Sequence, residues 1–293
     1  MLNATLQTEV TQRDATVRFA FGKNWRRYLA LVDEDRVRQA ERSIRELLGV
    51  SDLEGRSFLD IGSGSGLFSL AAHRLGARVH SFDYDADSVT CTAKLRQHYG
   101  GDDRDWIVER GSILDTSYVR SLGTFDVVYA WGVLHHTGAM WSALANAGAL
   151  VATGGRLAIA IYNDQGNWSQ RWRAVKRLYC SGALGKSVVC ASCIPVFVLR
   201  NLVSDLVAAR NPASRYTEYR RNRGMSVFHD WIDWLGGYPF EVARPEAIFD
   251  YFRDRGFDLR QLKTCGGTVG CNEYVFWLRG AGETPGGRQR DHT

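Results

Sequence analysis

A glycine-rich stretch between an apolar run and a helical pattern constrains the fold of this chain most strongly. It reads Phe58-Leu59-Asp60-Ile61-Gly62-Ser63-Gly64-Ser65-Gly66-Leu67-Phe68. Three alternate glycines allow a tight turn, and because they lack a Cβ atom the backbone can approach a ligand closely. Apolar residues at helical spacing follow the turn. The stretch therefore predicts a strand, a ligand-binding turn and a helix.

The spacing of the glycines indicates which cofactor the turn binds. The dinucleotide fingerprint has glycines at its first, third and sixth places, but the sixth place here is Leu67. Asp60 lies near the end of the predicted strand, where a carboxylate suits a cation. The pattern Asp-x-Gly-x-Gly-x-Gly resembles the first motif of the class I methyltransferases, which use S-adenosylmethionine. The alternative is a structural glycine turn in another α/β protein.

The resemblance implies how the cofactor is held. In that family the glycine loop cradles the amino-acid end of S-adenosylmethionine, and the acidic residue reaches its ammonium group through water or directly. The residues that occupy these places here are Asp60, Gly62, Ser63, Gly64 and Gly66. They form the first part of the expected cofactor site.

A second acidic residue lies roughly twenty residues after the glycine turn, the spacing at which a carboxylate can bind both ribose hydroxyls. This residue is Asp83, at the end of the alternating run 78–83. Tyr84 follows it and is also expected to contact the cofactor. Asp85 and Asp87 are better explained as caps of the next helix.

Strands and helices alternate after the glycine turn, which predicts a parallel sheet covered on both faces. Strands are expected at 57–61, 78–82, 106–109, 125–130, 156–161, 257–264 and 272–278. The expected fold class is α/β, a Rossmann-like seven-stranded methyltransferase sheet that is mostly parallel with an antiparallel C-terminal strand. N-terminal helices and a helical lid insertion complete it. The resemblance places Ser112 and Ile113, after the third strand, against the adenine ring.

Two adjacent histidines follow the fourth predicted strand. The run 125–136 resembles the post-strand motif of the ubiquinone-type O-methyltransferases, which lines the sulfonium and the substrate, and it adds Trp131 and Gly132 to the cofactor site. Methylation of a hydroxyl requires removal of a proton, and histidine titrates near neutrality. His136 is the first candidate base and His135 the second, unless they only fix the loop. No metal site is expected, because adjacent histidines without nearby carboxylates do not form a usual one.

The chain divides into five predicted segments. They are an N-terminal arm with cap helices at 1–50, the cofactor-binding Rossmann-like core at 51–163, a helical lid or acceptor insertion at 164–244, a C-terminal helix and strand pair that complete the core at 245–279, and a disordered tail at 280–293. The insertion of about eighty residues is too long for a bare loop. We expect it to build the acceptor pocket.

Three features of the insertion bear on function. Basic and aromatic residues interleave between Trp168 and Tyr179, which suits nucleic acid but more often gives a helix one packed and one solvated face. The stretch 187–199 is apolar and too short to cross a bilayer. Burial is the favoured interpretation of it, ahead of contact with a membrane surface or a lipophilic acceptor. His229 lies in a polar and aromatic segment and is the third catalytic candidate.

Composition and charge do not identify the binding partners of this chain. The chain of 293 residues carries a formal net charge of +5, which permits anionic partners without requiring them. Its six cysteines lack the spacing of a disulfide framework, and residues 1–10 include no apolar targeting segment. The cytoplasm is the expected compartment, no transmembrane segment is expected, and the oligomeric state stays open.

Three functions are compatible with these patterns. The first is an S-adenosylmethionine-dependent methyltransferase that acts on a hydroxyl of a small molecule, of lipophilic or aromatic character if the ubiquinone-type resemblance extends to the substrate. The second is an RNA-directed methyltransferase, suggested by the basic clusters at 171–177 and 215–223. The third is a non-catalytic protein that binds S-adenosylmethionine. The sequence does not decide between oxygen, nitrogen and carbon as the methylated atom.

Overall fold

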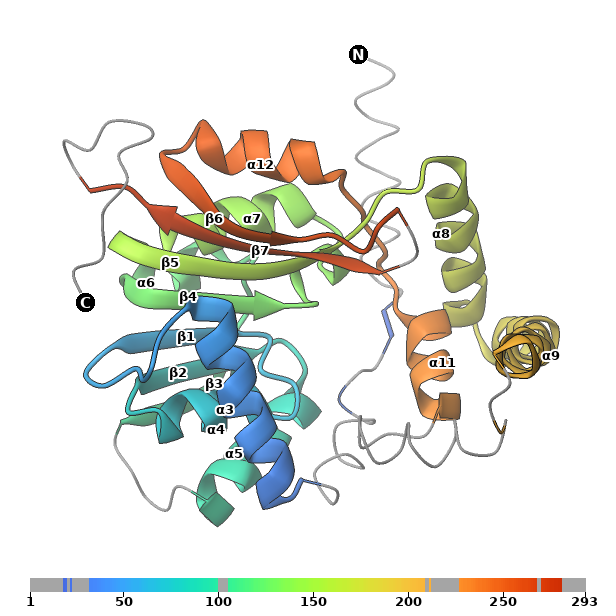
Figure 1. The fold of residues 1–293 in the computed structure, drawn as a ribbon, viewed down its shortest axis with the longest axis horizontal. Helices are drawn as coiled ribbons and strands as arrows, with labels where there is room; N and C mark the ends of the chain where they lie inside the picture. The colour runs from blue at the N-terminus through green and yellow to red at the C-terminus, as the bar shows by residue number, and fades with distance from the viewer. Residues whose placement is uncertain are drawn as a thin grey trace.

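A seven-stranded sheet forms the centre of the computed structural model (Figure 1). Its strands are β1 (Ser57–Ile61), β2 (Arg78–Asp83), β3 (Trp106–Arg110), β4 (Phe125–Trp131), β5 (Val151–Tyr162), β6 (Phe257–Lys263) and β7 (Cys271–Leu278). The order across the sheet is β3-β2-β1-β4-β5-β7-β6. The pairs from β3 to β5 are parallel, and β7 is antiparallel to both of its neighbours. This topology confirms the predicted fold class.

The structure describes residues 18–19, 22, 32–99, 105–208, 211, 227–267 and 270–280. The side chains at 227–230 and 233 are outside this description. Several predicted features also lie outside the described residues. They are the rest of the predicted N-terminal arm, the basic cluster at 215–223 and all of the predicted tail except Gly280. The described residues therefore include the core and most of the predicted lid.

Helices cover both faces of the sheet, because alternate strand residues point to opposite sides. One face is covered by α3 (Glu34–Leu48), α4 (Leu67–Arg74) and α5 (Ala86–Tyr99), and the other by α6 (Thr116–Ser121), α7 (Met140–Ala149) and α12 (Pro245–Arg253). Phe58 of β1 packs in the first layer and its neighbour Leu59 in the second. The sheet is thus buried on both sides, as its apolar strands require.

Local signals set the bounds of the first described helix, α3. The side chain of Asp33 accepts a hydrogen bond from the backbone N–H of Arg36 at 2.9 Å, which caps the amino end. Gly49 ends the helix with a φ of 63°, a left-handed conformation that glycine adopts at little cost. Val37 and Ile44 face the sheet from α3.

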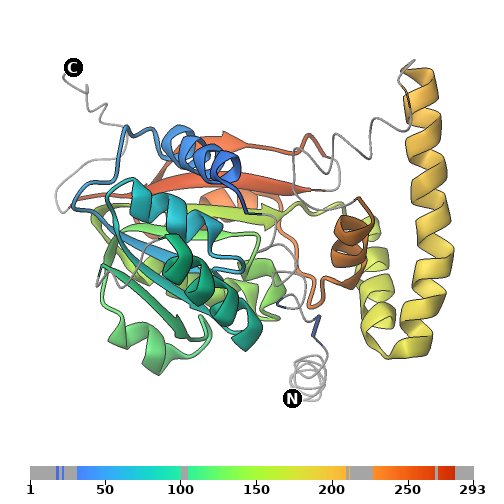
Figure 2. The same ribbon diagram turned by 90° about the horizontal axis from the view of Figure 1, so that it is seen from below.

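Three further helices form a layer beyond the carboxyl ends of the strands (Figures 1 and 2). They are α8 (Asn167–Cys180), α9 (Ala183–Val207) and α11 (Val227–Gly236), and their small core includes Tyr179, Val189 and Leu235. The expectation that the apolar stretch 187–199 is buried is wrong. Only one side of α9 packs on α8 and α11, and Val196 and Leu199 are each 60% exposed.

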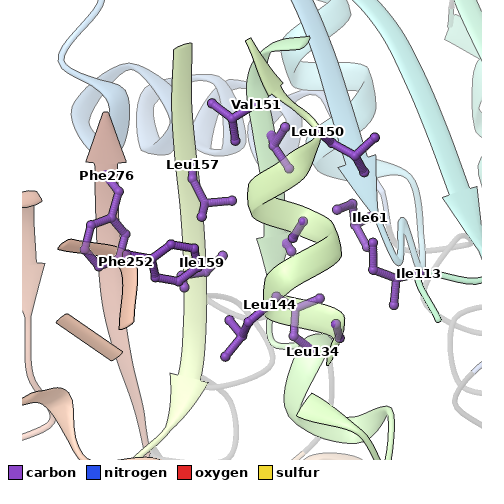
Figure 3. Packing of buried hydrophobic residues seen from close by; sticks show 14 of the residues in the cluster. Ile61, Ile113, Leu134, Leu144, Leu150, Val151, Leu157, Ile159, Phe252 and Phe276 are labelled. Atoms are coloured by element: carbon purple, nitrogen blue, oxygen red, sulfur yellow. The ribbon is translucent and has the colours of Figure 1, made fainter. Parts of the chain in front are cut away.

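Phe252 of α12 lies in the core of the second layer, between the sheet and the helices α6, α7 and α12 (Figure 3). Its replacement tests this packing. Its side chain is fully buried, with ring centroids 4.8 Å from Phe276 and 5.3 Å from Phe257. We expect Phe252→Ala to lower the free energy of unfolding by about 3–5 kcal/mol, because it leaves a cavity between α12 and the sheet. Urea denaturation measures this change. Leu262→Ala, at an exposed position of β6, is the control and should change stability by less than about 1 kcal/mol. Equal losses in both variants would contradict the described packing.

Candidate active site

A cavity of about 630 Å³ opens at the carboxyl ends of β1 to β4. The sheet order explains the position of the cavity. The chain adds β2 and β3 on one side of β1 and then crosses to β4 on the other side. Ligands of open α/β sheets bind at such a switch point. The predicted site residues that line it are Gly62, Gly64, Asp83, Tyr84, Ser112, Ile113, Trp131, Gly132 and His136. Asp60, Ser63, Gly66 and His135 do not line it.

The glycine turn forms one wall of the cavity. Gly62 and Gly64 have φ values of 74° and 56°, in the left-handed region that favours glycine. A Cβ atom on Gly62 would lie 2.5 Å from the side chain of Val133, so a larger residue would push apart the turn and the loop after β4. The backbone N–H groups of Gly62 and Ser63 donate to the carbonyl oxygen of Phe82 at 2.8 and 3.2 Å. These bonds fix the turn to the end of β2.

Asp83 holds the same turn and faces the cavity. Its Oδ2 accepts a hydrogen bond from the N–H of Gly64 at 3.0 Å, and its Oδ1 accepts one from the N–H of Asp85 at 2.8 Å. Burial raises the pKa of this carboxyl to about 6, although the backbone donors favour the charged form. An oxygen pair in this place can accept hydrogen bonds from ribose hydroxyls, and that contact stays a prediction.

Asp60 occupies a different environment from the one its sequence position suggests. Its carboxylate is buried under α4, where it accepts a hydrogen bond from the hydroxyl of Ser69. The hydroxyl of Ser81 donates to Ser69 at 2.8 Å and accepts from the indole of Trp106 at 2.9 Å. Burial raises the pKa of Asp60 to about 7, and the nearby Asp83 adds to the rise. The geometry gives Asp60 a structural role, and contact with the cofactor ammonium stays a prediction.

Two other residues of the glycine motif pack against α5. The hydroxyls of Ser63 and Thr92 are 2.9 Å apart and share a hydrogen bond. A Cβ atom on Gly66 would lie 2.9 Å from the Cα atom of Thr92. This glycine therefore allows the close approach of α4 and α5, while a direct role of Ser63 or Gly66 toward the cofactor stays a prediction.

The two histidines occupy unlike positions on the short 3-10 helix η1 (Leu134–His136). His136 lines the cavity, and its Nδ1 lies 2.7 Å from the carbonyl oxygen of Pro239. Because a carbonyl only accepts, Nδ1 carries the hydrogen and Nε2 is the basic nitrogen. Burial lowers the pKa of His136 to about 3, so the imidazole is neutral near pH 7.

His135 does not line the cavity. It is 1% exposed, and its ring centroid lies 4.1 Å from that of Tyr162. Burial, assisted by His136, lowers its pKa well below the ordinary value. Such a side chain supports the loop by packing, the alternative that the sequence left open. A part in catalysis stays a prediction for both histidines.

The sequence did not single out several residues that close the cavity. Arg18 donates from Nη2 to the carbonyl oxygen of Thr137 at 2.6 Å, and its guanidinium lies 5.0 Å from the ring of Tyr84. The N–H of Gly22 donates to Oδ2 of Asp85 at 3.0 Å. Asp85 thus anchors the N-terminal segment, in addition to lying at the start of α5. The aromatic residues clustered around Gly22 were a signal for this segment, but they did not identify Arg18.

The lid supplies the last part of the wall. Tyr238 and Pro239 line the cavity, and the carbonyl oxygen of Tyr238 accepts a hydrogen bond from the N–H of Phe19 at 3.0 Å. His229 belongs to α11, but its side chain lies outside the described residues. Within the described part of the chain, no group of three or more His, Cys, Asp or Glu residues could hold a metal ion.

Comparison with known proteins decides the family. The methyltransferase domain family matches residues 32–205, more than half of the chain. The chain belongs to this family. It is a class I methyltransferase, and its cofactor is S-adenosylmethionine, as the sequence predicted.

Curated relatives of this methyltransferase cover only part of its length. The ubiquinone biosynthesis O-methyltransferases of Rhodopseudomonas palustris strains TIE-1 and ATCC BAA-98 / CGA009 are each 31% identical to it over 143 residues. This match covers 48% of the chain and 51% of each relative, so the chain spans about half the length of the curated relatives it matches.

Solved structures share the fold at low identity. A chain in the complex that holds the Haloferax volcanii Trm112 methyltransferase activator is 14% identical, with a TM-score of 0.52 over 90% of this chain and 97% of that one. Magnesium protoporphyrin IX methyltransferase from Synechocystis PCC 6803 with bound SAH is also 14% identical, with a TM-score of 0.49 over 82% of each chain. At this identity the likeness describes the fold alone.

The residues around the cavity fit S-adenosylmethionine. Asp83 offers carboxylate oxygens for the ribose, and Ser112 and Ile113 form the wall after β3, where the adenine ring is expected. A Cβ atom on Gly132 would have no neighbour within 4 Å, so a ligand can approach this backbone closely. When bound, the cofactor supplies a methyl group activated by its sulfonium charge.

Asp83 makes cofactor affinity depend on pH. We expect the affinity for S-adenosylhomocysteine to fall between about pH 7 and about pH 5, approaching tenfold per pH unit, because the carboxylate must be ionised to accept hydrogen bonds from the ribose. Isothermal titration calorimetry measures this. Asp83→Asn should bind more weakly and lose most of the pH dependence. Asp115→Asn, which alters the exposed cap of α6, is the matched control and should bind like the wild type. If Asp83→Asn bound S-adenosylhomocysteine like the wild type, the predicted contact between Asp83 and the cofactor would be contradicted.

Asp60 makes stability depend on pH in a defined direction. Its pKa is raised on folding, so the folded chain holds this proton more tightly, and the stability that the protonated carboxyl provides is lost as the pH rises from about 4 through about 7. Asp60→Asn can still accept from Ser69 and avoids the buried charge. We expect the free energy of unfolding of this variant to be about 2–4 kcal/mol higher than that of the wild type at about pH 8. The difference should vanish near pH 4. Urea denaturation at both pH values checks this, and lower stability of the variant at pH 8 would contradict it.

Proposed function

We propose that this methyltransferase transfers a methyl group to a hydroxyl of a small molecule. The observation that carries the proposal is the hydrogen bond from Nδ1 of His136 to the carbonyl oxygen of Pro239, which leaves Nε2 as a basic nitrogen on a residue of the cavity wall. The name of the curated relatives, ubiquinone biosynthesis O-methyltransferase, supports an oxygen acceptor. The cytoplasm as compartment stays a prediction.

A neutral histidine suits the needs of a hydroxyl acceptor. Nε2 can accept a hydrogen bond from the hydroxyl and so turn an oxygen lone pair toward the methyl group. As the oxygen gains positive character in the reaction, its proton becomes acidic and can pass to Nε2. The low pKa of His136 makes it a weak base toward an unreacted alcohol. Orientation of the acceptor is therefore its main proposed role, with late acceptance of the proton.

The rest of the wall favours an acceptor with an apolar body. Phe19, Trp131, Val133 and Tyr238 line the cavity near the loop that carries His136. Pockets of this kind bind small molecules through apolar surface and a few placed polar groups. This supports a lipophilic or aromatic acceptor.

The basic cluster at 171–177 gives only partial support to an RNA acceptor. Lys176 is fully buried, and the exposed Arg173 donates to the carbonyl oxygen of Phe240 at 3.0 Å. Lys176 therefore adds nothing to an exposed phosphate-binding surface, and the contribution of this cluster comes from its three exposed arginines. The second cluster, at 215–223, lies outside the described residues.

Identification of the acceptor tests the proposal directly. The purified chain is incubated with methyl-labelled S-adenosylmethionine and a cell extract, and the labelled product is identified by mass spectrometry. A small molecule with a new methyl ether is the expected result. Label in RNA, on nitrogen or on carbon would overturn the proposed acceptor, and no label in any fraction would favour a non-catalytic protein.

Replacement of His136 separates its proposed role from cofactor binding. We expect His136→Ala to lower kcat for the identified acceptor by about 10²–10⁴-fold while its affinity for S-adenosylhomocysteine changes little. Because burial keeps the imidazole neutral, the wild-type kcat should show no loss from protonation of His136 near about pH 6.5, the ordinary pKa of histidine. His98→Ala, at an exposed position of α5, is the matched control. A kcat within about threefold of the wild type for His136→Ala would exclude the proposed role.

A further inference from the structure

Helix α9 is the outermost element of the lid (Figure 2). It spans 25 residues, and its most apolar window of 18 residues is only 6% buried within the structure. By length and composition it is the kind of helix that can enter a membrane. So much exposed apolar surface on one helix calls for a partner.

The exposed apolar side chains of α9 share one face. The large ones are Leu184, Val188, Val196, Leu199, Leu202, Val203, Leu206 and Val207. Most successive members are three, four or eight residues apart, about one or two helical turns, so they form a stripe along the helix. The adjacent pairs Leu202–Val203 and Leu206–Val207 widen this stripe toward the carboxyl end. Leu184 is 80% exposed and Leu206 is 63% exposed, which shows that the stripe runs from one end to the other.

The opposite face of α9 is packed on the protein. Val189, Cys193 and Phe197 join a core that includes Trp172 of α8 and Trp234 of α11. Because α9 is attached to α8 and α11 over residues 189–197, it cannot cross a bilayer while the lid is folded. It can lie flat in the interface between headgroups and acyl chains, where an amphipathic helix buries one side.

Charge around α9 favours an anionic partner. Within the described residues 164–208, which include α8 and α9, six side chains are Lys or Arg and two are Asp or Glu, a net charge of +4. Of the six basic side chains only Lys176 is buried. The one acidic residue of α9, Asp205, is 2% exposed, so the exposed charges of this helix are the basic residues Lys186 and Arg200. Long basic side chains beside an apolar stripe can reach lipid headgroups.

We propose that the apolar stripe of α9 docks this protein on a bilayer that contains anionic phospholipid. A second copy of the chain is a weaker occupant, because its residues 164–208 would bring another net charge of +4 against the first. A bilayer satisfies both the apolar stripe and the basic side chains. The proposal does not depend on the acceptor of the methyl group, since docking requires no turnover.

Vesicle flotation tests the docking surface with the full chain. Vesicles of phosphatidylcholine, with and without phosphatidylglycerol, are mixed with the protein in the absence of cofactor. We expect the protein to float with the phosphatidylglycerol vesicles. Leu199→Glu combined with Leu206→Glu should weaken this binding by roughly hundredfold or more, because two leucines no longer leave water. Lys186→Glu and Arg200→Glu should each weaken it by about fivefold and reduce its salt dependence.

Leu262→Glu, which adds a charge at an exposed leucine of β6, is the matched control and should bind vesicles like the wild type. Calorimetry with S-adenosylhomocysteine verifies that each variant is folded. A wild type that floats with neither vesicle overturns the proposal, and so does binding that the double leucine variant retains. A dimer in light scattering that the same variant converts to a monomer, without vesicle binding by either, would assign the stripe to a second copy.

Discussion

Hydrogen bonds between the glycine turn and the end of β2 are the constraint on which the cavity depends. The carbonyl of Phe82 and the carboxylate of Asp83 accept from three successive backbone N–H groups of the turn, those of Gly62, Ser63 and Gly64. The turn can present these groups only with left-handed φ values at its glycines. The same glycines remove the side chains that would fill the space above. One set of contacts therefore fixes the shape of the turn, the position of the acid and the opening for the ligand.

The contacts around the glycine turn bury two carboxyl groups away from water. Asp60 and Asp83 both have raised pKa values because burial disfavours their charged forms. The lid contains the opposite case in Lys176, whose pKa burial lowers to about 7. No acidic side chain of the described residues pairs with Lys176. Its ammonium donates to the carbonyl of Trp234 and lies 4.4 Å and 5.0 Å from the rings of Trp234 and Phe240. Carbonyl and aromatic groups compensate such a charge only in part.

The sequence predicts the core much better than the lid, for physical reasons. Apart from the start of β5, which lies at Val151 and not at the predicted residue 156, the strand bounds agree with the prediction within one residue. The agreement follows because buried parallel strands leave continuous apolar runs that turns interrupt. The places of Asp83, Ser112 and Trp131 follow from the topology, since every strand in the parallel part ends at the same edge. The direction in which the Asp60 side chain points depends on Ser69, a contact that spacing alone does not reveal. The exposure of α9 was missed because an apolar helix can have the same composition in a core and on an exposed surface.

The lid and the cavity form one continuous set of contacts. Phe197 of α9 packs on Trp234, which faces Lys176 of α8, and Lys176 also faces Phe240. The next residue back along the chain, Pro239, accepts the hydrogen bond from His136. Because closely packed side chains move little relative to one another, α9 has a defined orientation toward the cavity. The three lid helices lie beyond the carboxyl ends of the strands, where the cavity opens (Figure 1). Attachment through the α9 stripe would therefore hold the cavity end of the protein, and not its opposite end, beside the surface to which α9 binds.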